Sequence, residues 1–293
     1  MDSAKPAVAV LGMGVMGRAM ARAILRAGLP TTVWNRRPEA AGELATDGAR
    51  VAHDVADAVR NADVVITMVT DADAVLSVAG SGMLAALPRG AIWAQMSTIG
   101  VDGIERVRRL VEERRPDVAL LDAPVAGSRG PAEQGKLTVF ASGPETVRDR
   151  VAPVFDAVGQ RTVWVGPVGA GSKMKLVNNL VLAFATQGLA ESLGVAADLG
   201  LDVRTVLAAL DGSPLVSPWA AQKLDRIGRG EYGAEYALSL GLKDVDLALA
   251  HAPIDRLSAA NSILGQWRRA VDHGLGDADV TVVVRELMNS MHT

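Results

Sequence analysis

The amino-acid sequence predicts an α/β fold, in which an N-terminal Rossmann-type doubly wound sheet is followed by an all-helical C-terminal domain. Short apolar runs alternate with helical patterns in the first half, a glycine-rich turn follows the first run, and strand patterns stop at a glycine-rich joint at 166–171. This alternation is typical of a parallel sheet covered by helices. We expect a dinucleotide-binding domain at 1–165 and a helical substrate and oligomerisation domain at 166–293, which starts with a long interdomain helix.

The individual elements follow from hydrophobic periodicity. Runs rich in Val, Ile, Leu and Ala predict strands at 7–12, 31–34, 63–69, 91–95, 118–123 and 138–143. Apolar residues at helical spacing predict helices between them, among them 16–27 and 101–114. In the second domain, 172–199 has no proline and predicts one long helix, with later breaks at 212–218 and 228–233.

Composition favours a globular protein that binds small molecules. The chain has 293 residues, 49% hydrophobic and 22% charged, and a formal net charge of −3. Because it has no block of like charges, we expect no broad surface for nucleic acid or anionic lipid. With no cysteine and four scattered histidines, it should hold no disulfide, thiolate or metal site.

The N-terminal residues lack the basic start and long apolar core of a signal peptide. We find no run that approaches the roughly 20 apolar residues needed to span a bilayer. The expected location is therefore the cytoplasm.

A G-x-G-x-x-G motif directly follows the first predicted strand and opens a helix. In such a motif one glycine allows the tight turn, one lets the backbone approach a pyrophosphate and one lets helix pack on strand, while the helix N-terminus stabilises the anion. A plain turn between strand and helix is the alternative. The predicted cofactor residues here are Gly12, Met13, Gly14, Val15, Met16 and Gly17, joined by Met68, Val69 and Thr70 at the end of a later strand.

The end of the second strand indicates which dinucleotide is bound. NAD enzymes usually place Asp or Glu there to accept from the ribose 2′-hydroxyl. This chain has Asn35, Arg36 and Arg37 instead. Two guanidiniums would attract a 2′-phosphate, so we infer NADP(H), with Arg36 as first contact and Arg37 as support. Solvated surface arginines are the alternative.

The long helix carries a lysine in an almost wholly apolar stretch. Lys175 and Asn179 are four residues apart and share one helical face, while Met174, Val177, Val181 and Phe184 can pack elsewhere. A lysine desolvated in an apolar wall has a lowered pKa and is a better proton donor or acceptor near neutral pH. The alternative is a lysine that extends its ammonium to solvent, as we expect of Lys173.

Two loops should lie at the carboxyl edge of the sheet, where doubly wound folds bind ligands. Residues 122–128 end in Ala126, Gly127 and Ser128, whose backbone amides could hold a carboxylate, although a plain turn is the alternative. Ser97 and Thr98 follow the predicted strand at 91–95 and face the same edge. Lys243 and Asp244, taken alone, are typical of a solvated helix end.

With these motifs the chain resembles the β-hydroxyacid dehydrogenase family, which includes 3-hydroxyisobutyrate dehydrogenase and glyoxylate/succinic semialdehyde reductase. The resemblance spans nearly the whole chain, in segments at 12–20, 33–36, 97–99, 122–128, 169–179, 243–250 and 274–279.

The resemblance implies a role for several of these residues. Lys175 would be the catalytic lysine and Asn179 its orienting partner, with Thr98 and Lys243 as cofactor contacts. The loop at 126–128 would anchor the substrate, and Trp219 and Tyr236 are assigned to the same pocket. It also implies a homodimer or homotetramer assembled through the helical domain.

One departure concerns the anchor, because many family members have Ser where this chain has Ala126. Alanine has no hydroxyl to offer a carboxylate. Ser128 then carries that role, with the amides around Gly127.

We therefore expect reversible hydride transfer between NADPH and the carbonyl of a small aldehyde or keto acid, with Lys175 as general acid and base. Imine reduction is one alternative, since imine reductases resemble this architecture but generally lack the lysine. An apolar pocket for a cyclic imine would come from Phe184, Val216, Trp219, Tyr232 and Tyr236. A catalytically idle NADP-binding module is the other alternative.

Overall fold

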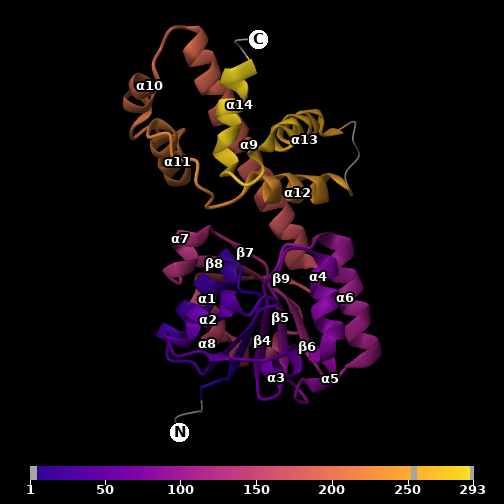
Figure 1. Cartoon of the computed structure of the whole chain (residues 1–293). Coiled ribbons are helices and arrows are strands. Elements are labelled where there is room, and N and C mark those ends of the chain that lie inside the picture. Colours follow the sequence, from indigo (N-terminus) through magenta and orange to yellow (C-terminus); the bar gives the residue numbers. More distant parts are fainter. Residues whose placement is uncertain (1–4, 252–255, 291–293) are drawn as a thin grey trace. The chain divides into compact units, whose positions relative to one another are not determined.

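A computed structural model describes residues 5–251 and 256–290 of the chain. It consists of two compact units, with the division between Lys175 and Leu176. The first unit is α/β and the second is helical, as the sequence predicts (Figure 1).

The first unit is built on one sheet, with strand order β3-β2-β1-β4-β5-β6-β8-β7 and with β9 beside β8. The strands are β1 (Val8–Leu11), β2 (Thr31–Trp34), β3 (Arg50–Val51), β4 (Val64–Thr67), β5 (Ile92–Gln95), β6 (Ala119–Asp122), β7 (Val125–Ala126), β8 (Leu137–Ser142) and β9 (Gly159–Gly166). The six predicted strands are present, and the short strands β3 and β7 and the longer β9 are additional.

Pairing is parallel from β3 to β6, whereas β8 runs antiparallel to both β6 and β7. The sheet is therefore doubly wound in its first part and mixed at the far end. Between β6 and β8 the chain turns back through β7 and a short helix, so it makes no long crossover of the kind that parallel neighbours need.

Helices cover both faces of this sheet (Figure 1). They are α1 (Val15–Arg26), α2 (Glu39–Gly42), α3 (Val55–Val59), α4 (Ala72–Val78), α5 (Leu84–Ala86), α6 (Gly100–Arg114), α7 (Arg129–Glu133) and α8 (Arg148–Val158). Along β1, Val8 and Val10 join the core beneath α1 and α8, while Ala9 and Leu11 join the core beneath α3, α4 and α6. This alternation is the period of two expected for a strand buried on both faces.

The second unit contains α9 (Ala170–Asp198), which begins in the first unit, followed by α10 (Val203–Leu210), α11 (Pro218–Gly228), α12 (Leu238–Leu249), α13 (Ser258–Ala270) and α14 (Val283–Ser290). Short 3-10 or π turns lie at Glu43–Ala45, Ala79–Met83, Glu145–Val147, Val271–Leu275 and Val280–Val282. The helices share one apolar core, whose buried members include Trp267, Leu193, Leu238 and Val245. The predicted breaks after α10 and α11 are present.

The sequence analysis expects no segment that could span a bilayer, but by length and composition α9 could do so. Its most apolar 18-residue window has a mean hydropathy of 1.5. About 39% of the window is buried inside the protein, and the core helix of a globular protein passes the same test.

Candidate functional site

The turn after β1 has the geometry that its glycines predict. Gly12 has φ +105°, and a Cβ there would lie 2.3 Å from the Met68 carbonyl oxygen. A Cβ on Gly17 would lie 1.8 Å from the Gly12 carbonyl oxygen, whereas one on Gly14 would meet nothing within 4 Å. Gly12 and Gly17 are thus required by the protein's own packing, while Gly14 leaves open space.

This open space lies at the N-terminus of α1. Gly14 is the N-cap residue and supplies no side-chain cap, and the first turn has no acidic residue. The amides of Val15 and Met16 therefore form a positive helix end that no acidic side chain compensates, and such an end suits a pyrophosphate. These features fit a dinucleotide.

Asn35 joins two loops, because both ends of its carboxamide are hydrogen-bonded within the protein. Its Oδ1 accepts from the Met13 amide at 3.0 Å, and its Nδ2 donates to the Arg37 carbonyl at 3.0 Å. Met13 itself is buried. Asn35 and Met13 therefore support the predicted cofactor loops, and the Met13 amide is already hydrogen-bonded within the protein.

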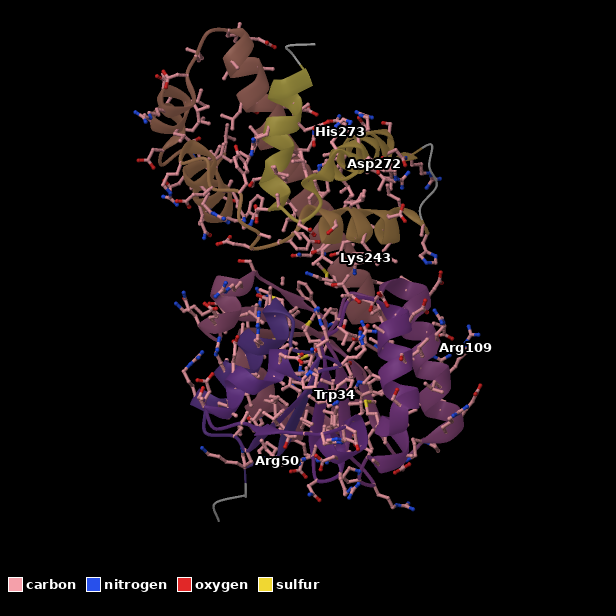
Figure 2. All side chains as sticks on the ribbon, in the orientation of Figure 1. Trp34, Arg50, Arg109, Lys243, Asp272 and His273 are labelled. Carbon is pink, nitrogen blue, oxygen red and sulfur yellow. The ribbon has the colours of Figure 1, made fainter. Side chains whose placement is uncertain are left out.

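Arg36 and Arg37 follow Trp34, the last residue of β2 (Figure 2), and both are exposed. Within the described part of the chain, neither guanidinium forms an ion pair or a hydrogen bond. Two unpaired guanidiniums beside the glycine turn suit an additional phosphate.

The loops after β4 and β5 are held together by a polar network. The hydroxyl of Ser97 accepts from the Val69 amide at 2.8 Å, and Ser97 is paired with the Gln95 carboxamide through both its amide and its carbonyl. Thr98 comes next and is half-buried. Met68 packs against the core under α1 and α8, and Thr70 is exposed and donates to Asp71 at 2.9 Å.

A buried carboxylate fixes the start of α9. Asp122, at the end of β6, accepts from the Ser172 amide at 2.7 Å and from its hydroxyl at 2.8 Å. Ser142 donates to the Asp122 carbonyl at 2.9 Å and accepts from the Gly171 amide at 2.9 Å. Burial raises the pKa of Asp122, although the hydrogen bonds from Ser172 and Ser142 act in the opposite direction.

This anchor positions the predicted catalytic lysine. Lys175 lies three residues, or about 4.5 Å of helix rise, beyond Ser172 and is half-buried. Asn179 follows one turn later and is 3% exposed.

The apolar residues expected to pack elsewhere around α9 are not all covered within the single chain. The side chains of Val177, Val181 and Phe184 are 57%, 65% and 41% exposed. The reason is that α9 is apolar on more than one face, so the helical unit alone does not cover all of them.

Asn179 belongs to a buried network in the second unit. Its Nδ2 donates to Asp244 Oδ2 at 2.6 Å, and the Tyr236 hydroxyl donates to the same oxygen at 2.5 Å. Asn179 Oδ1 accepts from Asn178 at 3.0 Å. Because the carboxylate only accepts, it fixes which end of the Asn179 amide faces it. Burial and the neighbouring Asp244 raise the pKa of Tyr236 well above its usual value, so this hydroxyl remains a donor.

The interpretation of Lys243 and Asp244 as a solvated helix end is wrong. Both lie on α12, where Figure 2 labels Lys243. Asp244 is 4% exposed and accepts hydrogen bonds from Asn179 and Tyr236. The Lys243 ammonium lies 3.0 Å from Asp244 Oδ1, yet this buried oxygen accepts no well-aligned hydrogen bond from the described residues.

The predicted substrate loop lies between β7 and α7. Ala126 ends β7, Gly127 has φ +123°, and Ser128 is the N-cap residue of α7 but makes no side-chain cap. Within the described residues the amides of Gly127 and Ser128 have no acceptor. Trp219, the other predicted pocket residue, is half-buried on α11. No group of three or more His, Asp or Glu in the described residues could hold a metal.

Sequence patterns do not reveal two of the anchors, Asp122 and Asp244. Asp122 is only the first residue of a loop motif, and the pattern around Asp244 favours solvent. Their partners lie 50 and 65 residues away in sequence, and no local pattern shows such pairs.

Comparisons with known proteins identify the family. The model of the NAD binding domain of 6-phosphogluconate dehydrogenase matches residues 7–166, and that of the NAD-binding region of NADP-dependent 3-hydroxyisobutyrate dehydrogenase matches 169–287. Glyoxylate/succinic semialdehyde reductase 1 of Arabidopsis thaliana is 31% identical over 94% of this chain and 96% of its own length. The NAD-dependent L-serine dehydrogenase of Pseudomonas aeruginosa is 29% identical, with the same two coverages.

Solved structures of other proteins also resemble this chain. The 3-hydroxyisobutyrate dehydrogenase of Salmonella typhimurium has a TM-score of 0.87 and 27% identity, covering 96% of this chain and 99% of its own. An imine reductase from Pseudomonas sp. has a TM-score of 0.62 and 24% identity, over 97% and 99% of the two chains, so it shares the fold.

Because these full-length relatives are dehydrogenases and reductases, the protein is an NAD(P)-dependent oxidoreductase. Both family models match in order along the chain, and it belongs to the β-hydroxyacid dehydrogenase family.

Proposed function

We propose that the protein is an NADP-dependent reductase of small aldehyde or keto acids, of the semialdehyde or glyoxylate class. The observation that carries the proposal is the lysine fixed in α9: Lys175 lies one turn before the buried Asn179 and three residues after the anchor formed by Asp122 and Ser172. A binding module without catalysis has no use for such a defined amine.

The cofactor preference is supported by Arg36 and Arg37. The glycine turn and the first-turn amides of α1 would hold the pyrophosphate, and the two exposed guanidiniums would hold a 2′-phosphate. The nicotinamide, when bound, would supply a hydride to the carbonyl carbon of the substrate.

The chain's own residues supply the proton. In reduction the Lys175 ammonium donates a proton to the carbonyl oxygen, which becomes the hydroxyl; in oxidation the neutral amine removes it. Asn179 orients the lysine or the hydroxyl. Its Nδ2 already binds Asp244, so its Oδ1, which has a second lone pair, is the end available for this task.

The loop at 126–128 is the proposed anchor for the substrate carboxylate. Ala126 cannot contribute a hydroxyl, but the amides of Gly127 and Ser128 and the Ser128 hydroxyl are uncommitted in the described structure. Anion binding by successive amides needs no particular side chain.

The test is NADPH oxidation against glyoxylate, succinic semialdehyde, methylmalonate semialdehyde, tartronate semialdehyde and one cyclic imine. We expect turnover of a carbonyl acid, and Lys175→Ala should lower kcat about a hundredfold or more while the Kd for NADPH is unchanged. Lys173→Ala, at an exposed position two residues earlier, is the matched control and should keep its kcat. Turnover of the imine alone, or a normal kcat for Lys175→Ala, would contradict the proposal.

We also propose that the helical unit forms a homodimer or homotetramer through one face of α9. Val177, Val181, Phe184 and Val195 share this face at helical spacing and are 57%, 65%, 41% and 57% exposed. A Cβ added at Gly188, on the same face, would meet nothing within 4 Å, so a second helix could approach closely there.

The oligomer is tested by the mass in solution, from light scattering after gel filtration. We expect Val181→Glu to dissociate the assembly, and Leu215→Glu, at a 91% exposed loop position, to leave it intact. A monomeric wild-type chain would refute the proposal.

A further inference from the structure

The helical unit contains a buried charge cluster that is not explained by the proposed chemistry. We define it as Lys223 and Arg226 on α11 together with Glu235 and Asp279. The Lys223 ammonium lies 2.9 Å from Glu235 Oε2 and 3.1 Å from both oxygens of Asp279. Arg226 lies 3.2 Å from Glu235 and 3.8 Å from Asp279.

Lys223 and Asp279 of this cluster are buried, Arg226 and Glu235 are partly buried, and the four formal charges balance. The exposed fractions of Lys223 and Asp279 are 2% and 0%. A buried ion pair is weak evidence for stability, because apolar residues of similar volume often serve as well or better. The cluster therefore invites an explanation by what it holds in place.

What it holds is the backbone around Tyr236. Asp279 Oδ2 accepts from the amides of Glu235 and Tyr236 at 3.1 and 3.2 Å. The Asp279 amide donates to Tyr232, and the Val280 amide donates to Tyr236, each at 2.9 Å. An apolar replacement at 279 could fill the volume but could not bind two amides at one point.

Tyr236 in turn connects this backbone with the network at Asn179. Its hydroxyl donates to Asp244 Oδ2 at 2.5 Å, and the same oxygen binds Asn179 at 2.6 Å. A shift of the 235–236 backbone would withdraw one of the two donors that orient Asp244.

We propose that the cluster of Lys223, Arg226, Glu235 and Asp279 is a positioning device, which sets the Tyr236 hydroxyl and, through Asp244, the Asn179 carboxamide for the reaction. The inference depends on the proposed function, in which Asn179 orients the lysine or the substrate hydroxyl. Its members touch neither substrate nor cofactor, so they are positioning residues.

The experiment is a double-mutant cycle between Lys223→Met and Tyr236→Phe, with kcat, substrate KM and the Kd for NADPH measured on each. Each single variant should lower kcat about tenfold or more, since small displacements of catalytic groups have effects of that size, with NADPH affinity unchanged. If Lys223 acts through the Tyr236 hydroxyl, Lys223→Met should change kcat less than about twofold in the Tyr236→Phe background.

Arg229→Met is the matched control, because Arg229 also lies beside α11 and pairs with Asp225 and Glu231, but with a side chain 51% exposed. It should keep the wild-type kcat. If Lys223→Met does not fold, Glu235→Gln keeps the residue's size and backbone amide, and should show a smaller loss of kcat with the same dependence on the Tyr236 hydroxyl.

The proposal is overturned if the substitution lowers kcat by the same factor with and without the Tyr236 hydroxyl, or if a folded Lys223→Met protein keeps its kcat. Failure of the proposed function would be seen separately, as normal turnover by Lys175→Ala. The two failures are therefore distinguishable.

Discussion

The carboxylate of Asp122 binds both the amide and the hydroxyl of Ser172, at 2.7 and 2.8 Å, and so joins the end of β6 to the first turn of α9. This contact satisfies the Ser172 amide, one of the amides at a helix start that have no partner within the helix. It also fixes the start of α9, and with it the place of Lys175 three residues further along the helix.

Asp122→Asn should lower the free energy of unfolding by about 2 kcal/mol, because the amide nitrogen of asparagine cannot accept one of the two buried hydrogen bonds from Ser172. Chemical denaturation of the wild-type and variant proteins measures this difference in the free energy of unfolding. Asp117→Asn, which loses an ion pair near the surface, is the control and should change it by less than about 1 kcal/mol. If both substitutions lower the free energy of unfolding equally, the Asp122 contact contributes no more to stability than the ion pair near the surface.

The pH dependence of stability should reveal Asp279. Burial raises its pKa, but Lys223 and the hydrogen bonds outweigh this, so the net pKa is lowered. A carboxyl with a depressed folded-state pKa stabilises above its unfolded-state pKa of about 3.9, and this contribution is lost as the pH falls through the folded-state value. Urea denaturation of wild type and Asp279→Asn should differ at pH 7 by about 3 kcal/mol, and the difference should shrink below about pH 4. A constant difference down to about pH 2.5 would contradict the assignment.

Two glycines of the turn should respond differently to alanine. Gly17→Ala places a Cβ against the Gly12 carbonyl and should reduce stability by about 3 kcal/mol or more. Gly14→Ala should change stability by less than about 1 kcal/mol, since the site is open, yet weaken NADPH binding by occupying the pyrophosphate's space. Thermal unfolding and fluorescence titration measure the two effects, and normal NADPH affinity in Gly14→Ala would place the pyrophosphate elsewhere.

Cofactor preference should depend on the two exposed arginines. Arg36→Gln and Arg37→Gln each remove a charge-assisted contact of about 1.5–3 kcal/mol, so the KM for NADPH should rise roughly 10- to 100-fold. The KM for NADH should be unchanged. Arg60→Gln, next to α3, is the control. An equal rise for both cofactors would mean that these arginines do not recognise the 2′-phosphate.

The sequence is sufficient for the elements with strong local patterns. It predicts β1, the glycine turn and α1 together, because alternation, glycine spacing and helix start coincide there. It does not predict β3, since Arg50 and Val51 make a two-residue strand without a pattern, and β7 is equally short. Of β9, only the end near Trp164 has a recognisable strand pattern.

The site is predictable where one residue type carries its own chemistry, as with Lys175 and the glycines. Roles that depend on distant partners are missed or misassigned. Asn35 is expected to contact the cofactor, and the local pattern does not show that its carboxamide also joins Met13 to Arg37. The local pattern places Asp244 in solvent because its partners, Asn179 and Tyr236, come from other elements.

The brace formed by Asn35 constrains how cofactor preference could evolve. Replacing Asn35 with the aspartate of NAD-type enzymes would add a carboxylate for the ribose. It would also remove the donor to the Arg37 carbonyl, so the loop at Arg37 would lose this hydrogen bond. Exchanges at Arg36 and Arg37 leave the brace untouched. The accessible mutational path from one dinucleotide to the other therefore begins at the arginines, and position 35 can change only after the loop has gained another support.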